Sequence, residues 1–108
     1  MKPTGPLIQG AALIFLLAVA QPQSARAADA ANGERIASRW CHSCHLATGR
    51  QQNGSDLAPP FSSIANDATL TPEGLHAALS GRHPRMPDFS LAREQIDDLS
   101  AYLRTLRK

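Results

Sequence analysis

Apolar residues are spaced along this 108-residue chain in two distinct ways. Residues 11–20 form an uninterrupted apolar run, whereas two later stretches place apolar residues three or four positions apart among charged ones. Such spacing puts the apolar side chains on one face of a helix, so both stretches are predicted to be amphipathic helices. The first runs from about Ala30 into a pair of cysteines, and the second runs from about Ala92 to Arg107. Their apolar positions are Gly33, Ile36, Ala37 and Trp40 in the first, and Ile96, Leu99, Tyr102, Leu103 and Leu106 in the second.

Capping signals predict a third helix between these two. Thr71 is a good N-cap residue, Pro72 suits the first helical position, and Gly81 suits the residue after the last turn. Residues 48–60 and 82–90 are rich in residues typical of loops, and no strand-like alternation of useful length follows the apolar run. The sequence therefore predicts a small all-α domain with long loops, which are tolerable in so small a domain when they wrap something.

The apolar run at residues 11–20 is shorter than the ~20 residues needed to cross a bilayer. Polar residues end the run, and Ala25-Arg26-Ala27 then supplies the small-x-small pattern of a cleavage site. Residues 1–27 are therefore predicted to be a secretory signal peptide, cut near Ala27, and residues 28–108 to be the folded domain. An uncleaved membrane anchor is the alternative. Export predicts a periplasmic location for the mature protein.

The charge of the predicted domain excludes one class of partner, and its size indicates that its core needs a further component. Removal of residues 1–27 takes two of the 11 basic residues and leaves all 9 acidic ones, so the domain is formally neutral. A nucleic-acid-binding domain is expected to be basic, and we therefore expect no nucleic-acid partner. A domain this small buries only about 60% of its unfolded surface and needs a further core filler. Its two cysteines are three positions apart and cannot tie distant segments together.

The motif Cys41-His42-Ser43-Cys44-His45 is the signature of covalent haem attachment. Helical positions i, i+3 and i+4 share one face, so the two thiols can form thioethers with the haem vinyl groups while His45 reaches the iron. Two alternatives lack support in the sequence, because a thioredoxin-like pair requires a βαβ context and a structural zinc site requires a fourth, correctly spaced ligand. The sequence therefore predicts one haem c per chain, which would also fill the core.

From Gly33 to Tyr102 the chain resembles class I cytochromes c. In that family a glycine eight residues before the first haem cysteine lets the terminal helices cross closely, and Gly33 occupies that position. The family's leucine and tyrosine, three residues apart in the last helix, correspond to Leu99 and Tyr102. Ala37 stands where the family has an aromatic residue, and Trp40 is expected to take over its packing. The resemblance implies a small cytochrome c fold, with three to five short helices wrapped around one covalently attached haem.

The resemblance also implies which residues surround the iron. In the family, a proline after the motif offers its carbonyl to the second ring nitrogen of the iron-binding histidine, and Pro59 fits that role for His45. A methionine followed by proline, one loop before the last helix, supplies the second axial ligand, and Met86 fits. His83 lies on the same loop and is the rival ligand, which would give a lower potential. The histidines not expected to bind iron are His42 and His76.

The resemblance implies an electron carrier rather than an enzyme: a monohaem protein that shuttles single electrons between a donor and an acceptor in the periplasm or membrane. No small-molecule substrate is expected, and the protein is expected to be monomeric and soluble after signal cleavage. The alternatives are a haem c subunit of an oxidoreductase complex, a small peroxidase and a gas-binding sensor. Arg82 and Arg85 flank the predicted methionine ligand, and they are expected either to guide an acidic partner or to be ordinary solvated loop residues.

Overall fold

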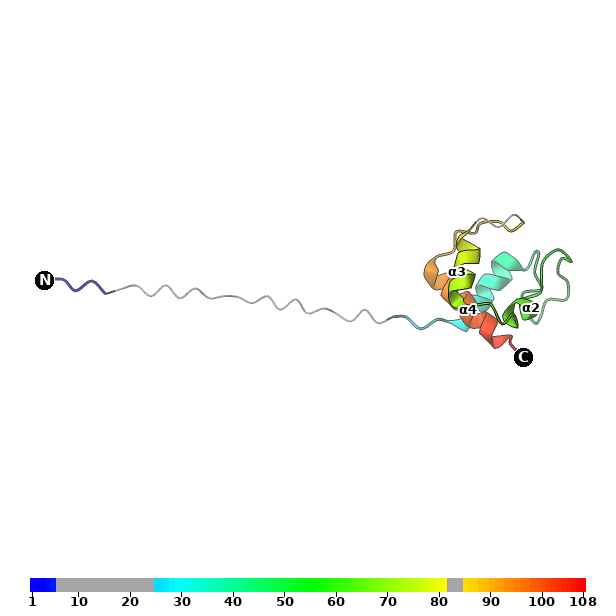
Figure 1. Ribbon diagram of the computed structural model, residues 1–108, viewed down its shortest axis with the longest axis horizontal. Helices are drawn as coiled ribbons and strands as arrows, with labels where there is room; N and C mark the ends of the chain where they lie inside the picture. Colours follow the sequence, from blue (N-terminus) through cyan, green and yellow to red (C-terminus); the bar gives the residue numbers. More distant parts are fainter. Residues whose placement is uncertain (6–24, 82–84) are drawn as a thin grey trace.

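The computed structural model describes residues 1–5, 25–81 and 85–108. These residues contain four α-helices and one π-helical turn, joined by loops (Figure 1). Helix α1 (Ala30–Ile36) continues directly into η1 (Ala37–Cys41), and α2 (Phe61–Ala65), α3 (Pro72–Ser80) and α4 (Arg93–Thr105) follow. These described residues contain no strand, so the predicted all-α class is confirmed. The apolar run at 11–20 lies outside them, and no helix within them is long and apolar enough to span a bilayer.

Helices α1 and α4, from opposite ends of the folded part, cross in close contact (Figure 1). Gly33 is buried at the crossing, where an added Cβ atom would collide with the carbonyl oxygen of Asp98 and lie 2.7 Å from Cβ of Tyr102. A residue with any side chain would therefore push the two helices apart. Leu99 and Tyr102 are both buried on α4 beside this crossing, in agreement with the predicted helix packing.

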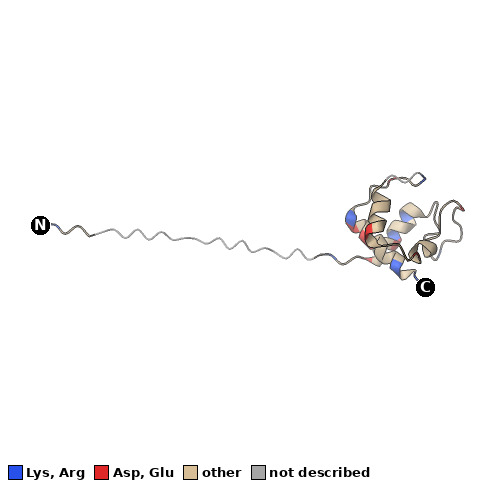
Figure 2. Cartoon of the chain, in the orientation of Figure 1, with Lys and Arg blue, Asp and Glu red and all other residues tan. Residues whose placement is uncertain are grey.

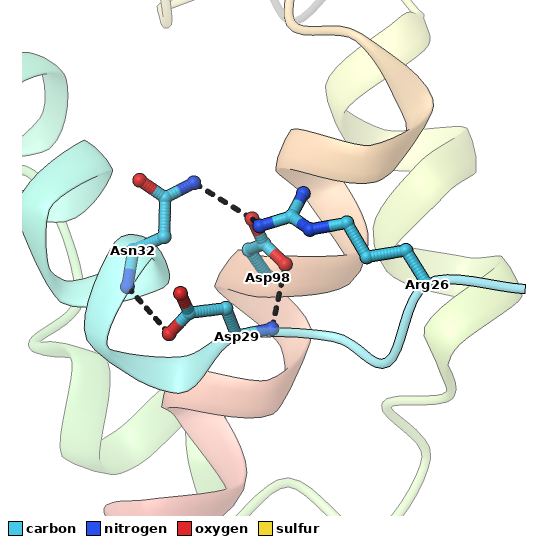
Figure 3. A network of polar contacts seen from close by, with 4 residues as sticks. All are labelled: Arg26, Asp29, Asn32 and Asp98. Atoms are coloured by element: carbon cyan, nitrogen blue, oxygen red, sulfur yellow. Dashed lines mark hydrogen bonds and ion pairs between the residues drawn. The ribbon is translucent and has the colours of Figure 1, made fainter.

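A buried carboxylate fastens the start of α1 to α4 (Figure 3). Asp98 is 1% exposed, and its two oxygens accept hydrogen bonds of 2.7 Å each from the backbone N–H of Asp29 and from Nδ2 of Asn32. Arg26 adds an ion pair at 3.5 Å from an exposed position. Asp29 in turn caps α1, because its side chain accepts a hydrogen bond of 3.1 Å from the N–H of Asn32. The entry of the chain into α1 is thus tied to the middle of α4.

Helices α2 and α3 also pack on α4 and complete the core. Thr71 caps α3 as predicted, since its Oγ1 accepts a hydrogen bond of 3.0 Å from the N–H of Gly74, and the helix ends before Gly81. His76 is partly buried, and its Nε2 lies 2.7 Å from Oδ1 of Asp97, which joins α3 to α4. The buried core residues are Ala37, Ala47, Phe61, Ala65, Leu75, Ile96, Leu99, Tyr102 and Leu103.

The predicted packing of Trp40 on the buried face of the first helix is wrong. Its side chain is 40% exposed and contacts the ring of Phe89 rather than the core. The reason is the π-helical turn, which changes the register of the side chains that follow α1. Ala37, at the start of η1, is fully buried, while the next three residues of this turn are exposed.

The Asp98 network makes stability depend on the charge of this carboxylate. The hydrogen bond from Asp29 lowers the pKa of Asp98 most, followed by the one from Asn32, while burial acts in the opposite direction and Arg26 adds a smaller lowering effect. The folded pKa therefore lies below the ordinary value of about 3.9. The resulting stabilisation is present above that value and is lost as the pH falls toward the folded pKa.

We expect Asp98→Asn to lower the free energy of unfolding at pH 7 by about 1–3 kcal/mol, because a neutral amide accepts these hydrogen bonds less strongly than a carboxylate. The difference from the wild type should shrink below about pH 4, where the carboxylate of the unfolded chain takes up a proton, and should be smallest below the lower folded pKa. Urea unfolding followed by circular dichroism measures both values. Asp56→Asn, at an exposed carboxylate, is the matched control. Equal losses for the two variants at pH 7 would contradict the role given to Asp98.

Candidate haem-binding site

The cysteine motif forms a single helical turn at the end of η1. The carbonyl oxygen of Cys41 accepts hydrogen bonds from the N–H groups of Cys44 at 3.2 Å and His45 at 2.9 Å. This turn makes the three side chains neighbours, because they occupy positions i, i+3 and i+4. Cys41 is half-buried, Cys44 is exposed, and the two are free thiols rather than a disulfide. The arrangement suits two thioethers to a single planar group.

Two observations argue against the alternative roles of the cysteine pair, a thioredoxin-like redox pair and a structural zinc site. Burial raises the pKa of the Cys41 thiol to about 11, so this side chain is protonated at neutral pH. The thiolate, not the thiol, is the nucleophile of disulfide exchange, so a protonated Cys41 is poorly suited to a redox-active pair. In residues 1–5, 25–81 and 85–108, moreover, no group of three or more His, Cys, Asp or Glu side chains is placed to hold a metal ion. Neither a thioredoxin-like pair nor a structural zinc site is supported.

The imidazole of His45 is held in one orientation and one tautomer. Its Nδ1 lies 2.7 Å from the carbonyl oxygen of Pro59. A carbonyl can only accept a hydrogen bond, so Nδ1 carries the proton and, in the neutral ring, Nε2 keeps its lone pair. The ring of Phe61 packs on this imidazole in an edge-type contact, with centroids 5.3 Å apart and planes inclined by 61°. His45 is therefore a histidine prepared to donate through Nε2.

Gln51, which was not among the predicted site residues, organises the backbone around the motif. Its Nε2 lies 2.7–2.8 Å from three carbonyl oxygens, those of His42, His45 and Asn53. Its Oε1 accepts a hydrogen bond of 3.0 Å from the N–H of Ala47. A polar residue in a segment predicted only as a loop carries no local signal for this role, which depends on how the chain turns back on itself.

Three further hydrogen bonds bring the loop after the motif back to it. The N–H of Ser55 donates to the carbonyl of Cys44 at 2.9 Å, and the N–H of Phe61 donates to that of Leu46 at 3.0 Å. On the other side, the hydroxyl of Tyr102 donates to the carbonyl of Ala47 at 2.8 Å and so connects α4 to the same stretch. Because both ends of the loop are fixed, the Pro59 carbonyl is held in place beside His45.

The segment that carries Met86 approaches the same end of the first helix. Met86 is half-buried on the connection between α3 and α4. Phe89, three residues later, packs against Trp40, with ring centroids 5.6 Å apart and planes inclined by 41°. Trp40 directly precedes Cys41, so this contact brings the Met86 segment to the motif. Arg82 and the rival ligand His83 lie outside the described residues, and Arg85 is exposed.

Comparison with known proteins identifies the family to which this chain belongs. A family model described as cytochrome c oxidase, cbb3-type, subunit III, matches residues 28–103. Cytochrome c-552 of Bradyrhizobium diazoefficiens is 41% identical over 96 residues, which are 88% of this chain and 92% of that protein. The chain belongs to the cytochrome c family. No solved structure matches it. As a member of this family, the cytochrome carries covalently bound haem c and is an electron carrier, so the cofactor prediction is confirmed.

The residues of this cytochrome fit haem c. Nδ1 of His45 is engaged by the Pro59 carbonyl, which leaves Nε2 for the iron, and the thiols of Cys41 and Cys44 are unbridged and one helical turn apart. Leu46, which directly follows the motif in the sequence, is a large apolar side chain that the polypeptide leaves 38% exposed. Exposed apolar surface beside two thiols is the surface that a planar apolar cofactor would cover.

We expect Gln51→Glu to destabilise the haem-loaded protein by about 1–3 kcal/mol, because a carboxylate cannot donate to the carbonyl oxygens that the amide now satisfies. Gln52→Glu introduces the same charge at the exposed neighbouring position and should change the stability by less than about 0.5 kcal/mol. Thermal unfolding of both variants provides the comparison. If the two substitutions had equal effects, Gln51 would be only an ordinary loop residue.

Proposed function

We propose that Cys41 and Cys44 form the thioethers to haem c and that His45 and Met86 are its two axial ligands. We further propose that the mature protein shuttles single electrons between a redox donor and acceptor in the periplasm. The haem supplies a reversible one-electron couple at its iron. The polypeptide supplies the attachment, the ligands and a fixed environment, and the rest of the proposal concerns these contributions.

The hydrogen bond between His45 and Pro59 is the observation that carries the proposal. A ligating histidine commonly gives its second ring N–H to a carbonyl or carboxylate, which fixes the ring and increases the basicity of the ligating nitrogen. His45 has this arrangement at 2.7 Å, on the residue that directly follows the second cysteine. The same contact leaves Nε2 as the ring nitrogen available to the iron, beside two thiols one helical turn apart.

Ligation by Met86 is supported by its position. Met86 is half-buried and is the only methionine within residues 28–108. A thioether ligand paired with histidine raises the potential of haem iron and suits a carrier. With both axial positions filled by the protein, no position is left for a substrate, so we propose a carrier rather than a peroxidase or a gas sensor.

Substitution of Met86 tests the ligand set. We expect the oxidised wild-type protein to show the weak charge-transfer band of sulfur ligation near the red end of the visible spectrum, and Met86→Ala to abolish it. The reduced variant should bind carbon monoxide at least about tenfold faster than the wild type, because its sixth position is open. Absorption spectra and stopped-flow mixing measure these changes.

His83→Ala is the control for the Met86 experiment, because His83 is the rival ligand and lies three positions before Met86 in the sequence. We expect this variant to keep both the band and the slow binding of carbon monoxide. Loss of the band in His83→Ala would make His83 the ligand. A wild-type protein that binds carbon monoxide as fast as Met86→Ala would favour the sensor or enzyme alternative.

The proposed location follows from the N-terminal segment. The family model begins to match at residue 28, directly after the proposed cleavage at Ala27, which supports residues 1–27 as a signal peptide and residues 28–108 as the cytochrome domain.

Basic and acidic residues are interspersed over the helices in the view of Figure 2, which fits a formally neutral domain. We propose a monomer that docks only briefly with its donor and its acceptor.

The description of the family model favours a second candidate function, a haem c subunit of an oxidoreductase complex. The relative from Bradyrhizobium is named a cytochrome c-552 and not a subunit of an oxidase, which supports the free carrier instead. We expect osmotic shock to release the protein without detergent, as a monomer by size-exclusion chromatography. A variant with cleavage blocked by Ala25→Leu and Ala27→Leu should stay with the membranes. Recovery of the wild type only inside a detergent-extracted complex would establish the subunit role.

A further inference from the structure

We infer that the contact between Trp40 and Phe89 is a latch that holds the Met86 loop against the haem attachment motif. Both are positioning residues, since neither side chain is a ligand, and the latch controls how readily the sixth axial position exchanges its ligand. This inference rests on the proposed ligation by Met86 and adds to it the residues that keep that ligand in place.

The latch joins the two segments that the cofactor would also join. Trp40 is the residue before Cys41, and Phe89 lies three residues after Met86. Their ring centroids are 5.6 Å apart and their planes are inclined by 41°, which is within the range of favourable aromatic pairs. The contact therefore connects the covalent attachment point directly to the loop of the proposed ligand.

The loop has few apolar anchors of its own. Among its described residues, only three side chains are half-buried, those of Met86, Phe89 and Leu91. Leu91 packs against the core at the start of α4. Phe89 is not part of that core, and its ring contact is with Trp40. If the Met86 sulfur binds the iron, Phe89 is the apolar side chain that anchors the middle of the loop.

The backbone next to Phe89 is held in a strained shape. Ser90 has a φ of 50°, in the left-handed region that residues with a side chain rarely adopt. The side chain of Asp88 supports this turn, because its Oδ1 accepts a hydrogen bond of 2.8 Å from the N–H of Ser90. Such a conformation persists where surrounding contacts hold it, and here it directs the chain from Phe89 into α4.

The exposure of Trp40 agrees with this role. The π-helical turn moves Trp40 out of the core, and a cation–π contact with Arg39, at 5.0 Å from its ring centroid, supports it at the surface. A tryptophan that only filled the core would be buried there. At its observed position the ring instead provides a platform for a residue from another segment.

Ligand exchange in the haem-loaded protein tests the latch. We expect Phe89→Ala to increase the rate of cyanide binding to the oxidised protein by about 3- to 10-fold, as the loss of a favourable aromatic pair predicts. Phe89→Leu keeps an apolar side chain without the ring and should give a smaller increase. Trp40→Ala should match Phe89→Ala, and the double variant should be no faster than either single one, because both remove the same contact. Leu57→Ala, which truncates an 80% exposed side chain elsewhere, is the control and should have no effect.

A Met86→Ala background separates failure of the latch from failure of the proposed ligation. With the ligand removed, Phe89→Ala should no longer change the rate of cyanide binding. If the wild type lacks the sulfur band and already binds cyanide fast, Met86 is not the ligand and the proposed function fails. If the wild type is slow, Met86→Ala is fast and Phe89→Ala equals the wild type, ligation stands and the latch is refuted. Slower electron transfer to a redox partner with unchanged cyanide binding would also refute the latch and would make the pair a docking surface.

Discussion

The close crossing of α1 and α4 at Gly33 fixes the positions of both sides of the haem site. Helix α1 leads through η1 directly into the cysteine motif, and α4 follows directly from the segment that carries Met86. A displacement of one helix along the other would therefore move the motif relative to the proposed sixth ligand. The missing side chain of Gly33 permits the contact, and the buried carboxylate of Asp98 fixes its register through the N-terminus of α1. The hydroxyl of Tyr102 also fixes the segment after the motif relative to α4, because it donates a hydrogen bond to the carbonyl of Ala47.

The two short hydrogen bonds to Asp98 do not depend on the N-terminal segment that we propose to be removed. Arg26 is its weakest member, since its side chain is 59% exposed and its ion pair spans 3.5 Å, and a surface ion pair of this kind contributes little. The two short hydrogen bonds come from Asp29 and Asn32, which both lie after the proposed cleavage point. Cleavage after Ala27 would also create a new α-ammonium group at Ala28, next to Asp29. The buried carboxylate would thus keep its hydrogen bonds and have a positive charge close by in sequence.

The features that could be predicted from the sequence are those that depend on residues close together in the chain. Periodicity located the first and last helices, Thr71 and Pro72 marked the start of α3, and the cysteine motif predicted the cofactor. The residues that were missed act through contacts distant in the sequence. Asp98 occupies a position that periodicity assigns only as polar, and its hydrogen-bond partners lie 66 and 69 positions away. Gln51 lies in a stretch without periodicity, and the π-helical turn that exposes Trp40 has no signature in hydrophobic spacing.

The two sides of the proposed haem site are held by different kinds of interaction. On the side of His45, Pro59 fixes the ring, Gln51 gathers the surrounding carbonyl groups, and the motif would add two covalent bonds. On the side of Met86, the described loop depends on apolar and aromatic contacts and on one side-chain-supported turn. Directional hydrogen bonds and covalent links resist displacement more than a tilted ring pair at the surface does. If Met86 is the sixth ligand, opening of the site should therefore begin on its side while the histidine stays bound, and the contacts of this loop would then determine how well the sixth position stays closed during electron transfer.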